Sequence, residues 1–407
     1  MMPKRVMSAA VPTWCATGLS LGAAGAVLNG VATLLAVLIA GVVVYALQRL
    51  QSATPEARST ADLVGSVLGA APARFTALLQ LTAYTIMAAA AGIGLGILSF
   101  YRAADPMAAL ASWWWPALSV AAVAVAAALV TVLSTRIIGA ITAVLAVVGL
   151  LVYFYLALAI TTEVYAGTPP VPVGGPQYFP STLYLIATLI PLGLALTGFE
   201  VAGVVSGRLR SVARPLATAL VLVAVCAAMS LVAVNVASVD GFHYRADAIA
   251  TLAGEFFGTQ ANTWLLAGSV PLSCAAILAL MWAATRVAGQ VFGTGATTSA
   301  LVAVAAAALA VVLCRFNQEI GGLLVVVAAM LLLVVYLLVA QANSRLTGPP
   351  AAVQGPRVVL VVTAVAVVLI PLGARDFLPV AWWPVGVTVV VLAIAAVVSG
   401  VARRRAQ

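Results

Sequence analysis

The segment STLYLIATLIPLGLALTGFEVAGVVSGRLRSVARP, from Ser181 to Pro215, decides how this chain folds. About twenty-five of its residues form a run apolar enough to cross a bilayer. Within this run lie helix-weakening residues such as Pro191, Gly193 and Gly198, and one carboxylate, Glu200. A charge at mid-membrane costs several kcal/mol, and Gly or Pro weakens the hydrogen-bond ladder, so these features persist mainly where backbone lines a cavity. The segment therefore predicts a broken membrane helix that holds part of a small-molecule site.

The composition predicts an integral membrane protein. Of the 407 residues, 64% are hydrophobic and only 7% are charged, whereas soluble proteins carry about 25% charged residues. Apolar runs separated by charged or Pro/Gly-rich breaks predict an all-α protein with about 12 transmembrane helices. The expected spans lie near residues 8–28, 30–48, 75–99, 113–133, 137–160, 182–206, 215–238, 264–285, 297–314, 320–341, 358–373 and 380–401.

The basic residues predict the orientation of these spans. With the N-terminus inside, fifteen of the nineteen Lys and Arg residues fall on the cytoplasmic side, and Arg102, Arg245, Arg315 and Arg375 fall outside. This asymmetry favours a multi-pass protein of the cytoplasmic membrane with both termini in the cytoplasm. The net charge of +9 then serves orientation and contact with the lipid bilayer, and nucleic acid is not an expected partner.

Two outer features are also predicted. Ile249, Leu252 and Phe256 recur at helical spacing in the segment from residue 239 to 263, which favours a short amphipathic helix over the outer mouth. It can be an outer lid, or it can simply pack on the surface. The tryptophans at 113–115 and 382–383 are expected at the outer edges of spans as interface anchors.

Glycines in the first span suggest a partner for the broken sixth span. Gly18, Gly22 and Gly25 weaken that helix, and an unwound turn would expose the amides of Ala23, Ala24 and Gly25 to a carboxylate. Small residues also serve close helix packing, so this signal alone leaves both interpretations open. The first and sixth spans, however, stand at corresponding places in two halves of opposite topology. Broken helices at matching positions of inverted repeats favour a transporter site near the bilayer midplane.

Other polar groups and glycines inside the spans are weighed individually. Desolvation favours the protonated form of Glu200, which makes it a candidate proton carrier or cation contact; alternatively, it holds the broken helix in shape through backbone groups. Ser269, Ser273 and Thr285 in the eighth span are the hydroxyls to inspect for a sodium site, with Ser269 and Ser273 as the candidates. In the third span, Gly92, Gly94 and Gly96 are expected to allow close helix approach.

The residues of an enzyme are not found in this sequence. His243 is the only histidine and falls in an outside loop, so histidine-based triads within the membrane are excluded. No G-x-x-x-x-G-K-[ST] motif is present, so nucleotide hydrolysis is unsupported. No cofactor or metal site is expected. An ion gradient, the substrate gradient or a partner must then supply the energy.

The segment Thr197-Gly-Phe-Glu200, followed by a basic loop and Arg214-Pro215, resembles the sixth span of the amino acid–polyamine–organocation (APC) transporters. Residues 29–69 resemble that family's second span and the loop after it, and residues 247–286 resemble its outer helix and eighth span. The order of these segments carries the resemblance, which covers most of residues 8–342. The compact chain is also similar to the bacterial amino-acid permease and exporter branch.

The resemblance implies a LeuT-type fold with 5+5 inverted repeats and two additional helices. Residues 1–160 would form the first repeat, residues 181–342 the second, and residues 357–402 the last two spans, in one membrane domain. The family's substrate contacts fall on backbone in the unwound turns of both repeats: Gly22, Ala23, Ala24 and Gly25, and Ala195, Leu196, Thr197 and Gly198.

The chain departs from the family pattern in informative places. The usual G-S-G or G-T-G of the first span is Gly22-Ala-Ala-Gly25 here. The aromatic gate of the sixth span is replaced by residues 194–196. Gly149 stands where some proton-coupled members carry a lysine, and the only lysine is Lys4, so that coupling mechanism is not available.

These observations predict a secondary active transporter for amino acids, neutral and hydrophobic ones in particular, or related small amines, working by alternating access with H⁺ or Na⁺. One alternative is a non-transporting membrane subunit or regulator with an eroded transporter fold. A membrane enzyme acting on lipid would need polar catalytic groups near one interface, and the sequence shows none. A twelve-span fold with two six-span halves is the structural alternative.

Overall fold

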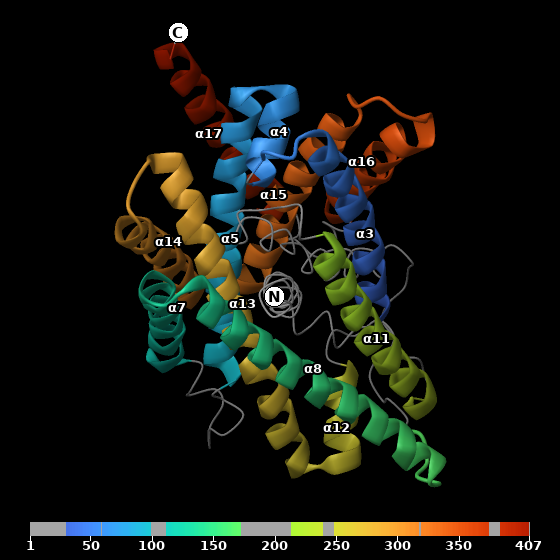
Figure 1. Cartoon of the computed structure of the whole chain (residues 1–407). Coiled ribbons are helices and arrows are strands. Elements are labelled where there is room, and N and C mark those ends of the chain that lie inside the picture. Colours follow the sequence, from blue (N-terminus) through green and yellow to red (C-terminus); the bar gives the residue numbers. More distant parts are fainter. Residues whose placement is uncertain are drawn as a thin grey trace, which may run out of the picture.

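A computed structural model describes residues 30–57, 59–98, 111–171, 213–238, 248–316, 319–373 and 383–406. These residues are helical almost throughout (Figure 1). The helices are α3 (Gly30–Ala53), α4 (Thr60–Leu68), α5 (Ala70–Leu98), α7 (Trp114–Val132), α8 (Thr135–Tyr165), α11 (Ala213–Ala237), α12 (Ala248–Phe257), α13 (Thr259–Phe292), α14 (Ala296–Phe316), α15 (Glu319–Asn343), α16 (Pro350–Gly373) and α17 (Trp383–Ala406).

Ten of the twelve predicted spans coincide with long helices, and the other two, at 8–28 and 182–206, lie outside the described residues. Seven of the described helices are long and apolar enough to cross a membrane. Large apolar side chains such as Val132, Leu151 and Ile394 are exposed on their outer faces, as expected where a helix meets lipid rather than protein. The chain is therefore a multi-pass membrane protein.

The order of helices repeats along the chain. The series α3, α4, α5, α7, α8 runs long, short, long, long, long, and the series α11, α12, α13, α14, α15 repeats it. The two short helices lie at opposite ends of the molecule, α4 at the top and α12 at the bottom of Figure 1. We call these ends the α4 end and the α12 end. A repeat whose equivalent surface helices face opposite sides is an inverted repeat.

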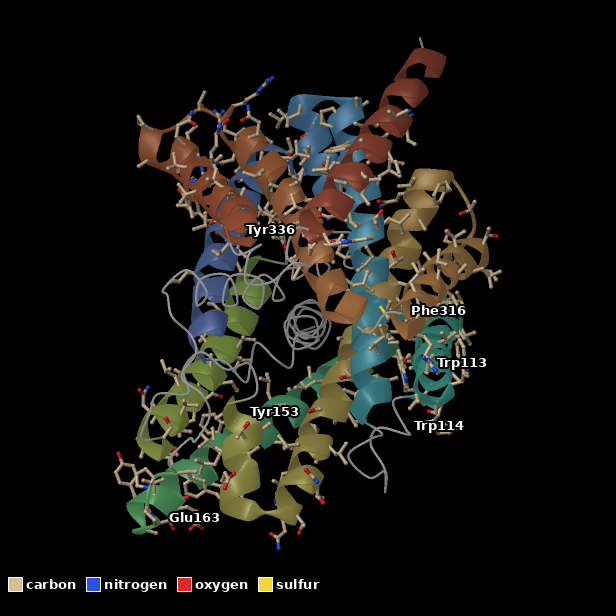
Figure 2. All side chains as sticks on the ribbon, turned by 180° about the vertical axis from the view of Figure 1, so that it is seen from behind. Trp113, Trp114, Tyr153, Glu163, Phe316 and Tyr336 are labelled. Atoms are coloured by element: carbon tan, nitrogen blue, oxygen red, sulfur yellow. The ribbon has the colours of Figure 1, made fainter. Side chains whose placement is uncertain are left out.

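The described helices form two packed groups. In the first, α5, α7, α13 and α14 all pack against one another, and the pair α5 and α13 makes the most extensive contact in the structure. In the second, α3 packs against α11. The groups lie on opposite sides of Figure 1 and again of Figure 2, and α8 and α15 each contact both of them.

Small residues allow the close packing of the first group. A Cβ atom on Gly96 would lie 2.7 Å from the Trp115 carbonyl oxygen, and one on Gly92 would lie 3.1 Å from the Ser119 carbonyl oxygen. These two glycines therefore bring α5 against α7, which confirms the prediction for them. Gly94 faces open space, with nothing within 4 Å of the position that a Cβ atom would take, so the prediction is wrong there.

The outer elements follow the sequence in part. The predicted amphipathic helix is α12, and Ile249 and Leu252 are fully buried. It packs against α8, α11 and α13, which is compatible with either of its two interpretations. Trp113 and Trp114 are exposed as expected of interface anchors, whereas Trp115 is 2% exposed and packs in the core. The backbone of Trp115 lies against Gly96 of α5, at the contact between the two helices.

Candidate functional site

Most of the predicted site residues lie outside the described residues. This is true of the first-span and sixth-span residues together: Gly22, Ala23, Ala24, Gly25, Ala195, Leu196, Thr197, Gly198 and Glu200. The two candidate ion-site serines, Ser269 and Ser273, are described and belong to α13. The geometry of the site is therefore built from the helices of the two repeats that follow the broken spans.

The two serines flank a proline inside α13. Pro271 has no backbone N–H, so the carbonyl oxygen of Ala267 loses its usual helical donor. Ser269 and Ser273 are each 7% exposed. The two hydroxyls lie one turn apart on the same face of α13, and the Ala267 carbonyl lies toward the opposite face, so the serines alone are candidate oxygen ligands for sodium.

A tyrosine from α8 contacts this part of α13. The Tyr153 hydroxyl and the Ser269 hydroxyl form a short, buried hydrogen bond. Gly268 makes room for the ring, since a Cβ there would lie 3.1 Å from Tyr153 Cε2. The bond occupies one side of the Ser269 oxygen, which leaves its remaining lone pair for another ligand.

Gly149 brings α8 against α13 one helical turn before Tyr153. A Cβ at Gly149 would lie 2.3 Å from Leu272 Cγ and 2.8 Å from the Gly268 carbonyl oxygen. Helix packing thus fills the Gly149 position, which the sequence predicts to be equivalent to a lysine of some proton-coupled APC members. A longer side chain has no room there unless the two helices separate.

Sequence reasoning missed three tyrosines. Tyr84 in α5, Tyr153 in α8 and Tyr336 in α15 are the largest fully buried side chains in the described structure. Gln80 Nε2 donates to the Tyr84 hydroxyl at 3.0 Å. Figure 2 shows Tyr153 and Tyr336 toward the middle of the molecule and Trp113 on its flank. A tyrosine in the middle of a span, rather than at its edge, is the signal that could have found them.

Tyr153 and Tyr336 occupy similar places in the last helix of each repeat. Tyr153 stands 18 residues after Thr135, and Tyr336 stands 17 residues after Glu319. Tyr336 lies nearer the α4 end and Tyr153 nearer the α12 end (Figure 2). Within the described ranges, no three His, Cys, Asp or Glu side chains come together as a metal site.

Comparison with known proteins identifies the fold. No family model matches the chain, and no curated protein matches its sequence. The crystal structure of MhsT in complex with L-phenylalanine matches with a TM-score of 0.58 and 13% sequence identity, over 89% of this chain and 98% of that chain. At this identity the likeness concerns the fold alone. It confirms the predicted all-α, LeuT-type membrane fold.

Proposed function

We propose that this chain is a secondary active transporter that moves amino acids across the cytoplasmic membrane by alternating access. The observation that carries the proposal is the LeuT-type arrangement, which extends over nearly the whole of both chains compared. MhsT was crystallised with L-phenylalanine, which supports an amino acid as the substrate here. Assignment to the APC family, both termini in the cytoplasm and the absence of enzymatic activity belong to the same proposal.

The proposed substrate site lies between the unwound turns of the first and sixth spans. Backbone of Gly22–Gly25 would hold the substrate carboxylate, because free amides at a helix N-terminus attract an anion. Backbone of Ala195–Gly198 would hold the ammonium group. The repeats would comprise residues 1–160 and 181–342, followed by residues 357–402. The matching order of long and short helices in the two described series supports this division.

A neutral, hydrophobic amino acid fits the surroundings better than a cationic one. The described core carries buried tyrosines and aliphatic side chains, and Glu200 is the only acidic residue expected within a span. A lysine or arginine side chain would need a carboxylate of its own to offset its desolvation. Small amines without a carboxylate would leave the first-span amides unused.

The coupling ion is proposed from two sets of residues. Ser269 and Ser273, two buried hydroxyls one turn apart on one face of α13, would hold sodium. Glu200 would bind a proton or keep the sixth span in shape. Transport coupled through a fifth-span lysine is not part of the proposal, because packing against α13 fills the Gly149 position.

Ligand-dependent stability tests this proposal on purified protein. A ligand present at about one hundred times its Kd stabilises the folded state by about 2.7 kcal/mol. We expect neutral amino acids such as L-phenylalanine and L-leucine to raise the melting temperature, sodium to increase that rise, and Ser273→Ala to remove the sodium effect only. Ser230→Ala, a buried serine in α11, is the matched control. If no amino acid changes the melting temperature, the proposed site is wrong.

A further inference from the structure

An arginine of α3 binds the corner between α15 and α16 at the α4 end. Arg49 lies in the last turns of α3. Its Nη1 donates to the Ala352 carbonyl oxygen at 2.7 Å, and its Nη2 donates to the Thr347 carbonyl oxygen at 3.1 Å. Both acceptors belong to the corner between α15 and α16. Hydrogen bonds from a charged donor are about twice as strong as neutral ones.

The corner is shaped to receive this guanidinium. Asn343 Nδ2 donates to the carbonyl oxygens of Ala352 and Val353 at 3.2 Å each, so the first turn of α16 is held in place from α15 as well. Gly348 has a φ of +154°, and a Cβ there would lie 2.6 Å from Arg49 Nη2. The backbone conformation therefore favours a glycine here, and any larger residue would push the Arg49 guanidinium aside.

The contact joins α3, a member of one group, to a corner whose helix α15 packs more extensively on the other group. Arg49 is carried by α3, whose main partner is α11, whereas α15 packs most extensively on α5 and less extensively on α3, which α16 also contacts. Direct packing of α3 or α11 against α5 or α13 is at most marginal. Relative movement of the two groups at the α4 end would thus change the distance between α3 and the α15–α16 corner.

The described residues of α11 carry no charge at the place equivalent to Arg49. The helix that corresponds to α3 is α11, and it carries no charged residue after Arg214. Near its end, Asn235 donates to the Leu231 carbonyl oxygen of its own helix at 2.9 Å. A charged connection of this kind therefore exists at the α4 end, and the described residues show no counterpart at the end of α11.

We propose that Arg49 is a latch, which holds the α4 end closed by binding the α15–α16 corner and releases it when the transporter opens on that side. The latch rests on the proposed alternating access. In the closed form, the guanidinium nitrogens of Arg49 keep their hydrogen bonds to the α15–α16 corner. In the open form, these nitrogens are hydrated instead. Removing the guanidinium therefore favours the open form without any change at the substrate site.

Spin-label distances in the full-length protein test the latch. Ser52 in α3 and Gln290 in α13 are exposed at the α4 end and belong to different groups. With the four native cysteines replaced by alanine, we would label this pair and compare the native arginine with Arg49→Met. Loss of bonds to a charged group typically shifts an equilibrium at least about tenfold. We expect Arg49→Met to raise the ratio of long to short distances between the two labels by about tenfold.

Several controls make the result specific. Arg345→Met makes the same change at an exposed arginine of the same corner and should leave the ratio unaltered. A label pair at Val132 and Gln290 lies within one group, and its distances should not change in any variant.

Gly348→Ala displaces the Arg49 side chain by a separate route and should shift the distances in the same direction as Arg49→Met. Arg49→Lys, which cannot bond both carbonyls with a planar fork, should be intermediate.

Equal distance distributions in Arg49→Met and Arg345→Met, both folded, would overturn the latch. So would an unchanged distribution in Gly348→Ala if Arg49→Met does not fold. These distances need no substrate, so the latch can fail while amino-acid binding is observed. Conversely, if the distances change as expected but no amino acid binds, the Arg49 latch is supported and the proposed amino-acid substrate is wrong.

Discussion

Gly149→Leu is expected to abolish most of the folded protein. The first side-chain atom alone would lie 2.3 Å from Leu272 Cγ and 2.8 Å from a backbone carbonyl oxygen of α13. Overpacking of a tight core commonly costs about 1–3 kcal/mol, and the rest of a leucine side chain adds to that cost. We would measure the monodisperse fraction after detergent extraction and the melting temperature of whatever remains.

Matched variants separate this contact from a general effect of losing a glycine. Gly94→Leu lies on α5 with nothing within 4 Å of its Cβ position, and it should fold normally. Leu272→Ala should partly rescue Gly149→Ala, because it removes the side-chain clash and leaves the carbonyl at 2.8 Å. A normal melting temperature for Gly149→Leu would contradict the close approach of α8 and α13.

Glu200→Gln is expected to remove the response of transport to a proton gradient. A gradient of two pH units supplies about 2.7 kcal/mol per proton, or about a hundredfold in accumulation at equilibrium. Glutamine has nearly the same shape as glutamate but cannot carry a proton, so this driving force should be lost in the variant. Uptake into proteoliposomes with and without the imposed gradient measures the effect.

The same substitution at an exposed carboxylate is the control. Glu163→Gln, near the end of α8 (Figure 2), should respond to the gradient as the unaltered protein does. A full response in Glu200→Gln, with normal folded yield, would remove the proton role of Glu200. A low folded yield would instead favour its alternative role in holding the sixth span in shape.

The long helices could be predicted because each needs about twenty apolar residues, and hydropathy reports that length directly. Hydropathy does not report where a helix ends. The apolar run predicted near 264–285 becomes α13, Thr259–Phe292, which continues to a left-handed Gly293. The run predicted near 358–373 becomes α16, which begins at Pro350. Helix ends depend on caps and turns rather than on contact with lipid.

The short helix α4 was missed although its sequence carries a start signal. The Ser59 side chain accepts from the Asp62 backbone N–H, and Gly69 ends the helix at a φ of +100°. A serine followed three residues later by an acid is typical of a helix N-terminus. The equivalent helix of the second repeat, α12, was predicted from its apolar spacing. Comparing the repeats would have predicted both.

The site could be predicted only as a pair of broken spans, because side-chain partners between distant helices leave no local pattern. The hydrogen bond between Tyr153 and Ser269 joins residues 116 positions apart. The close contact of Gly149 with Leu272 and Gly268 of α13 likewise depends on the register of two helices. Composition and spacing indicate which helices approach closely, but the identity of each contact requires the fold.

Counterflow in proteoliposomes tests the central claim most directly. Vesicles loaded with an unlabelled neutral amino acid would be diluted into a trace of the labelled one, without any ion gradient. A carrier working by alternating access exchanges the two, so we predict transient, saturable accumulation of label that empty vesicles and protein-free vesicles do not show. No counterflow of any amino acid or small amine, from protein shown to be folded, would contradict the account and favour a non-transporting subunit.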